Sequence, residues 1–229
     1  MVSLSNHADR RAIHRPVNPR SGFAPRRVGI LGGSFNPAHE GHLEISLAAL
    51  ARLGLDEVWW MVSPQNPLKA RAGMAPLARR LAEARAMARH PRIRVTNVET
   101  RLGTQFTADT LAALVRAFRH TRFVWLMGAD NLTQIPSWDR WQQIFNGVAI
   151  AVFNRPTYCF GALAGVAARR FARRRLAVSA AGRLAGKTPP AWVFLFTRLN
   201  PISASAIRAR RLSGTKPRKR RSRGDGANR

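Results

Sequence analysis

One segment constrains the fold of this chain more than any other: Gly32-Gly33-Ser34-Phe35-Asn36-Pro37-Ala38-His39-Glu40-Gly41-His42. An apolar run at residues 28–31 precedes it, and residues 43–53 follow with apolar side chains at helical spacing. The pattern predicts a strand, a tight turn and the start of a helix, where backbone N–H groups converge on an anion. Two glycines let the main chain approach a phosphate without an intervening Cβ. The segment therefore predicts a phosphate-binding turn.

Two histidines give this turn its chemical character. His39 and His42 are three residues apart, so on a helix they share one face beside its positively polarised end. The glycine spacing of a dinucleotide fingerprint is missing, and no Gly-Lys-Ser/Thr of a Walker loop follows. A zinc site is disfavoured because no clear third ligand accompanies the two histidines, and we predict no metal ligands. A pair of surface or capping histidines is the alternative.

The rest of the chain alternates between short apolar runs and helical periodicity, which is typical of a parallel α/β sheet. Strands are expected at residues 28–31, 57–62, 93–98, 122–127, 148–153 and 192–196. Helices are expected at residues 39–53, 75–90, 107–119, 131–135, 138–146, 163–174 and 203–211. This order favours one Rossmann-like, doubly wound, mostly parallel α/β sheet, with ligands at the carboxyl ends of its strands.

Composition restricts the class of protein. A chain of 229 residues with 45% hydrophobic residues can bury a core, and no apolar run reaches the ~20 residues of a membrane span. A single cysteine excludes an internal disulfide and favours a cytoplasmic location. Half of the formal charge of +28 lies in residues 1–27 and 208–229, which show no apolar periodicity. We expect flexible basic tails at residues 1–25 and 213–229 around one domain, residues 26–212, whose own basic charge suits polyanionic ligands.

A second anion-binding pattern occurs late in the chain, which reads Ile202-Ser203-Ala204-Ser205-Ala206-Ile207-Arg208. Ser203 occupies the position of a helix N-cap, and Ser205 and Arg208 lie three apart on one face of the first turns. Hydroxyls, unpaired N–H groups and a guanidinium at a helix start can bind phosphate. An ordinary capped helix with a surface arginine is the alternative. Together the two patterns would hold a triphosphate from two sides.

These two motifs, with others between them, resemble those of the bacterial nicotinate-nucleotide adenylyltransferases, within the nucleotidylyltransferase superfamily. The first reads Gly-Ser-Phe-Asn-Pro-x-His-x-Gly-His and the last Ile-Ser-x-Ser-x-Ile-Arg. Between them stand Phe106-Thr107-Ala108-Asp109-Thr110-Leu111, Gly128-Ala129-Asp130-Asn131, Pro136-Ser137-Trp138 and Asn154-Arg155-Pro156. The resemblance covers about residues 27–211, with the motifs in the family's order.

The resemblance implies transfer of the adenylyl group of ATP to nicotinate mononucleotide, giving deamido-NAD and pyrophosphate. The mononucleotide phosphate is ionised at neutral pH and attacks the α-phosphorus directly. Catalysis would then depend on positioning and charge stabilisation rather than on a general base. In that reaction His39, His42 and Arg208 would be the catalytic residues, and Mg²⁺ would accompany ATP.

The resemblance also divides the site residues between the two substrates. Besides His39, His42 and Arg208, ATP would be bound by Gly32, Gly33, Ser34, Phe35, Gly128, Asp130, Ile202, Ser203 and Ser205. Nicotinate mononucleotide would be bound by Lys69, Thr107, Trp138, Asp139 and Arg155, with its ring stacked on the Trp138 indole. The alternatives are core packing for Trp138, a helix N-cap for Asp130 and plain surface exposure for Arg155.

The chain also departs from the family pattern. Where the family often has Pro-Pro-His-Lys, this chain reads Asn66-Pro67-Leu68-Lys69, so Lys69 alone would contact a phosphate there. Asn36 stands where many relatives carry Asp, and the family's further apolar segment after the last motif is replaced by a basic run. Related enzymes that act on nicotinamide mononucleotide or pantetheine phosphate are the nearer alternatives, and a nucleic-acid-binding protein on this fold is a more distant one. The sequence leaves the acid or amide preference and the oligomeric state open.

Overall fold

Seven parallel strands form one sheet in the computed structural model, which describes residues 24–64, 73–155, 159–197, 204 and 207–208. In these residues every pair of neighbouring strands is parallel, in the order β3-β2-β1-β4-β5-β7-β6. The strands are β1 (Arg26–Gly33), β2 (Glu57–Val62), β3 (Ile93–Thr96), β4 (Thr121–Gly128), β5 (Ala149–Phe153), β6 (Arg175–Leu176) and β7 (Trp192–Leu195).

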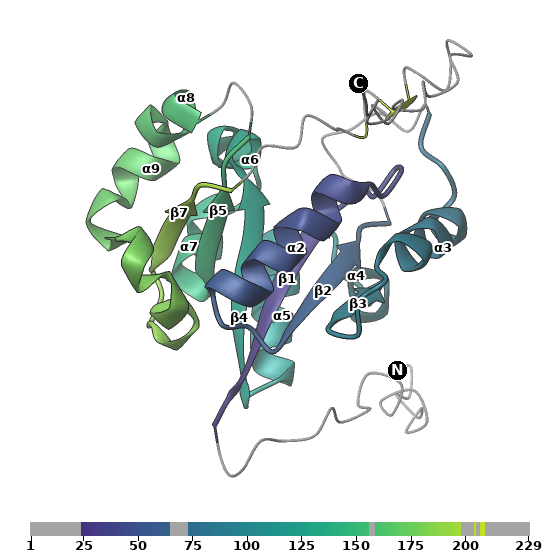
Figure 1. Ribbon diagram of the computed structural model, residues 1–229, viewed down its shortest axis with the longest axis horizontal. Coiled ribbons are helices and arrows are strands. Elements are labelled where there is room, and N and C mark those ends of the chain that lie inside the picture. The colour runs from purple at the N-terminus through teal and green to yellow at the C-terminus, as the bar shows by residue number, and fades with distance from the viewer. Residues whose placement is uncertain (1–23, 65–72, 156–158, 198–203, 205–206, 209–229) are drawn as a thin grey trace, which may run out of the picture.

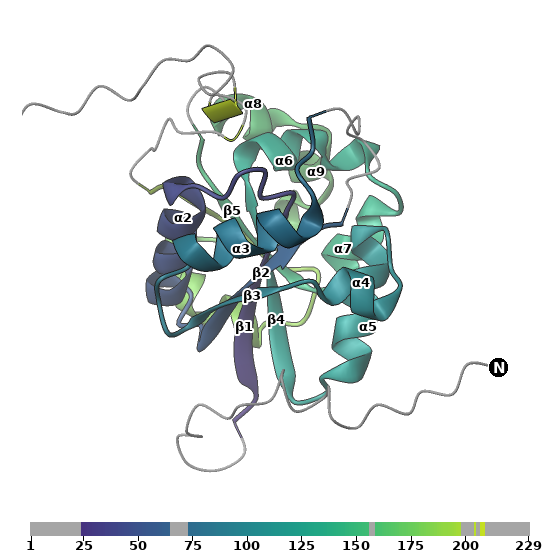
Figure 2. The ribbon, with the colours of Figure 1, turned by 90° about the vertical axis from the view of Figure 1, so that its right-hand side faces the viewer.

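Helices cover both faces of this sheet (Figures 1 and 2). One face packs against α2 (Glu40–Arg52), α3 (Leu77–Met87) and the 3₁₀ segment η3 (Val178–Gly186). The other face packs against α4 (Val98–Leu102), α5 (Thr107–Ala117), α6 (Ala129–Gln134), η1 (Ile135–Ser137), α7 (Trp141–Gly147), α8 (Cys159–Ala164) and α9 (Val166–Arg170), with η2 (Ala172–Arg174) after them. Because both faces are covered, β2 and β5 are buried along their whole length. No described helix is long and apolar enough to cross a bilayer.

The strand order places a switch point between β1 and β4. From β1 the chain runs outward to β2 and β3, then returns to β4 on the other side and continues to β5. The connections that follow β1 and β4 therefore leave in opposite directions and open a crevice at the carboxyl ends of these strands. The doubly wound α/β prediction is confirmed, and the sheet is parallel throughout the described residues rather than mostly parallel.

Several predicted element boundaries were wrong, for local reasons. The strand expected at residues 93–98 ends at Thr96, and α4 follows it, closed by Gly103 at φ +64°. The helix expected at 138–146 begins at Trp141, because Arg140 has φ +46°, outside the helical region. The helix expected at 163–174 is divided by the extended backbone of Gly165. The two expected tails and most of the helix at 203–211 lie outside the described residues.

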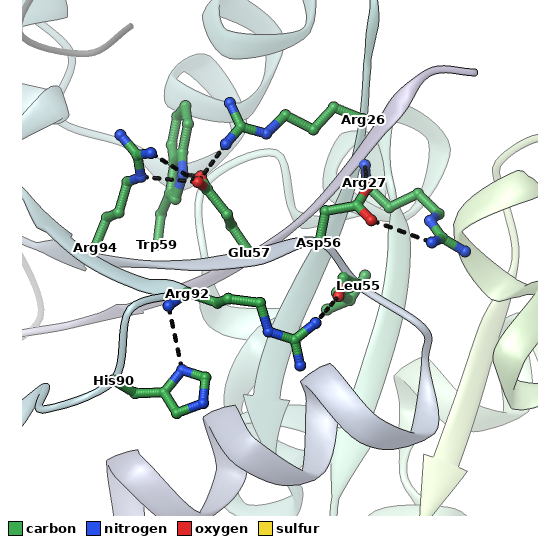
Figure 3. Close-up of polar contacts among 9 residues, drawn as sticks. All are labelled: Arg26, Arg27, Leu55, Asp56, Glu57, Trp59, His90, Arg92 and Arg94. Atoms are coloured by element: carbon green, nitrogen blue, oxygen red, sulfur yellow. Dashed lines mark hydrogen bonds and ion pairs between the residues drawn. The ribbon is translucent and has the colours of Figure 1, made fainter. Parts of the chain in front are cut away.

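A buried acidic residue joins three strands at the amino end of the sheet (Figure 3). Glu57 on β2 has 2% of its side chain exposed and forms ion pairs with Arg26 on β1 and Arg94 on β3. Its other oxygen accepts a hydrogen bond from Trp59 Nε1 at 2.9 Å. A buried carboxylate is tolerated when charged partners and hydrogen bonds compensate for its lost hydration. This end of the sheet is therefore closed by a satisfied network.

A buried arginine joins loops at the carboxyl end. Arg80 on α3 is 1% exposed, and its guanidinium donates to four main-chain carbonyls. Nη1 bonds Ser34 O at 2.7 Å and Ser63 O at 2.6 Å, Nη2 bonds Pro64 O at 2.8 Å, and Nε bonds Ala75 O at 2.8 Å. The planar fork of a guanidinium suits this task, because its donors point in fixed directions. Arg80 thus ties the turn after β1 to the loop after β2.

Replacing Arg80 with Met is expected to lower the free energy of unfolding by about 2–4 kcal/mol, because buried carbonyls would lose their donors. Chemical denaturation measures this value. The neighbouring Arg79 is the matched control: its side chain is 63% exposed and paired with Glu83, so Arg79→Met should change stability by less than about 0.5 kcal/mol. An Arg80→Met protein as stable as the wild type would show that the four hydrogen bonds contribute no net stability.

Candidate active site

A cavity of about 310 Å³ opens at the carboxyl ends of the central strands. Its wall comes from the turn after β1, the loops after β2, β4 and β5, and the start of α5. The structure brings twelve of the predicted site residues onto this wall. They are Gly32, Gly33, Ser34, Phe35, His39, His42, Thr107, Gly128, Asp130, Trp138, Asp139 and Arg155.

The late motif is described only in part, but it reaches the same place. Ala204 lines the cavity, and Arg208 Nη1 donates to the carbonyl of Asn36 at 2.6 Å. This contact brings the two motifs together across 172 positions of sequence. Lys69, Ile202, Ser203 and Ser205 lie outside the described residues, so their predicted roles stay predictions.

Phe35 holds the turn in an unusual backbone conformation. It has φ +46°, a left-handed value that costs energy for a residue with a side chain, and its ring is 1% exposed. The ring stacks on Trp60 with centroids 5.2 Å apart and meets His42 at 4.6 Å. Packing of this ring therefore compensates for the strain of the turn, and its contact with His42 helps to fix the position of the imidazole.

Asn36 fixes the next position of the turn through both ends of its side-chain amide. Nδ2 donates to Gly73 O at 2.9 Å, and Oδ1 accepts from Ala75 N at 3.2 Å. An ionised aspartate has no donor for the first of these bonds. The asparagine that departs from the family pattern thus binds the segment leading into α3.

The two histidines stand at the amino end of α2 in a defined arrangement. His39 is the N-cap residue and is 4% exposed, and the two imidazole centroids are 3.9 Å apart. The His39 main-chain N–H donates to Nδ1 of His42 at 3.2 Å. Because Nδ1 of His42 accepts this bond, a neutral His42 ring carries its proton on Nε2. His42 is therefore prepared to donate from Nε2.

Burial keeps both imidazoles neutral. Burial and, to a smaller extent, the nearby positive charge of Arg155 lower the pKa of His39 to about 4. The pKa of His42 is also well below its usual range, first because of burial and then because of His39 and Arg155. At neutral pH both rings act as uncharged hydrogen-bond donors. An anion between them would favour the charged form and raise both pKa values.

Side chains leave little room for a Cβ at two glycines on the wall. A Cβ on Gly32 would lie 2.2 Å from the Trp125 indole, and a Cβ on Gly128 would lie 2.3 Å from Asp130 Oδ1. Gly33 has room for a Cβ, with Phe35 3.6 Å away. The sequence argument attributed both members of the Gly32-Gly33 pair to phosphate approach. The structure adds a packing reason for Gly32.

Asp130 and Arg155 form an ion pair on the wall, with 3.6 Å between Oδ1 and Nε. Asp130 is in the first turn of α6, whose N-cap is Gly128, so the capping alternative for Asp130 was wrong. Arg155 follows β5 and acts on both histidines electrostatically. It therefore stands close to the turn after β1 as well as to Asp130.

Another part of the cavity wall combines an aromatic ring with a helix start. Trp138 is half-buried, packs on the core of its face of the sheet and lines the cavity, and Thr107 is the first residue of α5. Arg140 joins the two segments. It binds both carboxylate oxygens of Asp109 on α5, at 2.8 and 2.7 Å, and Asp139 Oδ2 at 2.5 Å.

Two buried residues of the wall with polar side-chain atoms were not predicted from the sequence. Glu99 and Trp125 line the cavity and are 4% and 3% exposed. Glu99 Oε2 and Trp125 Nε1 lack a hydrogen-bond partner among the described residues, as does His39 Nδ1. The available signal was the position of Glu99 directly after a predicted strand, at the edge of the sheet where ligands were expected. It was missed because residues 93–98 were predicted as one strand and no element was expected directly after it. Among the described residues no three His, Cys, Asp or Glu side chains cluster as a metal site would require.

Comparison with known proteins agrees with this arrangement. The model of the cytidylyltransferase-like family matches residues 30–210. A probable nicotinate-nucleotide adenylyltransferase of Cereibacter sphaeroides (strain ATCC 17025) is 55% identical over 182 residues, covering 80% of this chain and 96% of the relative. A protein of the same name from Parvibaculum lavamentivorans is 54% identical over 184 residues, covering 80% and 92%.

Solved structures of low sequence identity share the fold. Plasmodium falciparum nicotinic acid mononucleotide adenylyltransferase, complexed with APC and with NaAD, aligns with a TM-score of 0.59 in both cases. The identities are 16% and 17%, and the alignments cover 80% of this chain and 83% of the other. Identities this low speak for the fold alone. The relatives at about half identity decide the family, and the chain belongs to the nicotinate-nucleotide adenylyltransferases, within the cytidylyltransferase-like group.

Proposed function

We propose that this chain transfers the adenylyl group of ATP to nicotinate mononucleotide, giving deamido-NAD and pyrophosphate. One observation carries the proposal: a single cavity joins two chemically different halves. One half has a helix start with two neutral histidines, which suits phosphate oxygens. The other half has the half-buried indole of Trp138 and a second helix start, which suits an aromatic ring bearing a carboxylate.

The first half would bind ATP. The Nε2–H group of His42 and the N–H groups at the start of α2 point donors at an anion, and Arg208 is held nearby by Asn36. The mononucleotide phosphate oxygen forms a bond to the α-phosphorus while the bond from that phosphorus to the bridging oxygen breaks. Pyrophosphate leaves with the electron pair, and no proton moves. The protein's task is to align the two phosphates and to stabilise the charge that develops on non-bridging oxygens.

The second half would bind the mononucleotide. Trp138 supplies a face for the nicotinate ring, and Thr107 with the first N–H groups of α5 faces its carboxylate. Arg140 keeps these two segments at a fixed separation by holding Asp109 and Asp139. Arg155 lines the cavity and acts electrostatically on both histidines, so we assign it to phosphate binding. Lys69 is assigned to the same task from the sequence.

Mg²⁺ would enter with ATP. It supplies positive charge to the polyphosphate, and phosphate oxygens with water would hold it, because the described residues form no cluster of three ligands. Ser203 and Ser205 would add hydroxyls at the far end of the triphosphate. We place the reaction in the cytoplasm, which agrees with the single cysteine of the chain.

The proposal is tested by incubating the purified chain with ATP, Mg²⁺ and nicotinate mononucleotide. Deamido-NAD and pyrophosphate should appear in equal amounts. Parallel reactions with nicotinamide mononucleotide and with pantetheine phosphate identify a sibling activity, and faster turnover of pantetheine phosphate would contradict the ring-binding half. Absence of product from every acceptor, with tight and salt-sensitive RNA binding, would favour a nucleic-acid-binding role instead.

His42→Ala is expected to lower kcat by roughly a hundred- to thousandfold, since one donor to transition-state charge would be lost. Steady-state kinetics measures the loss, and thermal unfolding checks that the fold remains. His120→Ala is the matched control, because His120 is exposed on the loop before β4 and lies far from the cavity wall. A His42→Ala enzyme with normal kcat would refute the role of this ring.

Trp138→Ala is expected to raise KM for the mononucleotide roughly ten- to hundredfold, the usual range for loss of one stacking face. KM for ATP should change little, because Trp138 comes from a different segment of the wall than the histidines assigned to ATP. Trp138→Phe keeps an aromatic face and should recover most of the affinity. An increase confined to the KM for ATP would show that the ring binds elsewhere.

A further inference from the structure

Glu99 is a buried carboxyl group on the cavity wall that the proposed reaction does not use. It is 4% exposed and lies in α4, between β2 and α5. Ser63, after β2, and Thr110, one turn into α5, hydrogen-bond to the carboxyl group. Its Oε2 has no hydrogen-bond partner among the described residues. A buried polar atom left without a partner beside a cavity is a candidate for contact with a ligand.

Glu99 shares the half of the cavity that suits the mononucleotide ring. The same wall includes Thr107 and Trp138. Thr110 stands three residues after Thr107, on the same face of α5. The main-chain carbonyl of Glu99 also accepts from Thr104 N at 3.1 Å, which joins α4 to the segment leading into α5. The carboxyl group is thus held beside the expected position of the ring substituent.

The surroundings of Glu99 make both protonation states accessible near neutral pH. Burial raises the pKa of Glu99 to about 7, and the hydroxyls of Ser63 and Thr110 oppose the rise. The opposition is limited at Thr110. Its hydroxyl has one proton, and two other acceptors compete with Glu99 for it: Phe106 O at 3.1 Å and Thr104 Oγ1 at 2.8 Å. The carboxyl group is therefore neutral below about pH 7 and ionised above it.

Resting on the proposed function, we propose that Glu99 selects between the acid and amide forms of the mononucleotide through its own proton. A neutral Glu99 donates a hydrogen bond to the nicotinate carboxylate. An ionised Glu99 repels that carboxylate and accepts a hydrogen bond from the NH₂ group of nicotinamide instead. Two carboxylates in one poorly hydrated site cannot both ionise without a large cost.

Other charged groups face this region from each neighbouring element. On β2, Glu57 is at the opposite end of the strand and is paired with Arg26 and Arg94. On α5, Asp109 is paired with Arg140. The other charged or titratable residues of the cavity wall are His39, His42, Asp130, Asp139 and Arg155. The two histidines are expected to meet phosphate groups, which the acid and amide substrates have in common, so a change in their protonation affects both substrates alike and cancels in the ratio.

The test is a ratio of specificities measured against pH. At saturating MgATP, kcat/KM is determined for nicotinate mononucleotide and for nicotinamide mononucleotide from about pH 5.5 to 8.5. This range spans the pKa of Glu99. The ratio of acid to amide should fall at least about tenfold as the pH rises through the pKa of Glu99. Titration of the substrate phosphates is common to both substrates and cancels in the ratio. A ratio that does not change with pH would overturn the proposal.

Glu99→Gln provides the matched variant, because glutamine has the same shape and stays neutral. Its NH₂ group still donates to the carboxylate, so the ratio should remain at its acid-favouring value at all pH values. Glu83→Gln on the outer side of α3 should keep the wild-type profile. A Glu99→Gln ratio that still falls with pH would overturn the proposal. The wild-type profile decides the matter even if Glu99→Gln does not fold.

Proton uptake gives a readout without turnover. At about pH 8, binding of nicotinate mononucleotide should take up a proton at Glu99, whereas binding of nicotinamide mononucleotide should not. Calorimetry in two buffers of different ionisation enthalpy measures this difference, which should vanish in Glu99→Gln. Equal proton uptake for both ligands would overturn the proposal. If neither mononucleotide is adenylylated, the proposed function fails and this inference with it. Turnover with a flat ratio defeats the role of Glu99 alone.

Discussion

The guanidinium of Arg80 connects the parts from which the cavity is built. Its donors bind main-chain carbonyls of Ser34 in the turn after β1 and of Ser63 in the loop after β2. The Ser63 hydroxyl in turn binds Glu99, whose second hydroxyl partner is Thr110 on α5. One chain of polar contacts therefore runs from α3 through the loop after β2 and Glu99 on α4 to α5.

The two ends of the parallel sheet differ in whether their buried polar atoms have hydrogen-bond partners. At the amino end, Glu57 has charged partners on both sides and an indole donor, and both of its oxygens are bound. At the carboxyl end, His39 Nδ1, Glu99 Oε2 and Trp125 Nε1 have no hydrogen-bond partner among the described residues. A folded chain rarely leaves such atoms unpaired, because each costs free energy. Their gathering on one wall marks that wall as the place where a ligand supplies the missing partners.

Local patterns were enough to predict the parts of the fold that local chemistry decides. The strand, turn and helix around His39 follow from a short apolar run, two glycines and helical periodicity, and the order of the remaining runs predicted a doubly wound sheet. The prediction that Trp138 stacks on the nicotinate ring came from the family resemblance and not from the physical properties of the sequence. The role of Arg80 was not predicted. Its place among Leu77, Leu81 and Ala84, on the apolar face of the helix, is a signal of a buried cation that the sequence does contain. Its carbonyl partners are distant in sequence, and no periodicity reveals them.

The charge state of the cavity is a tertiary property that sequence could not supply. Histidines at a helix start suggest positive charge, yet burial and Arg155 lower both pKa values and keep the rings neutral. Burial has the opposite effect on the pKa of Glu99, which it raises to about 7, so that this carboxyl group is partly protonated at neutral pH. Among the described residues of the wall, fixed charge is thus limited mainly to the Asp130–Arg155 pair and the exposed Asp139. Each substrate brings charge with it and shifts the protonation of the groups it meets, since phosphates favour protonated imidazoles and a ring carboxylate favours a protonated Glu99. Substrate recognition and proton binding are therefore linked in both halves of the cavity.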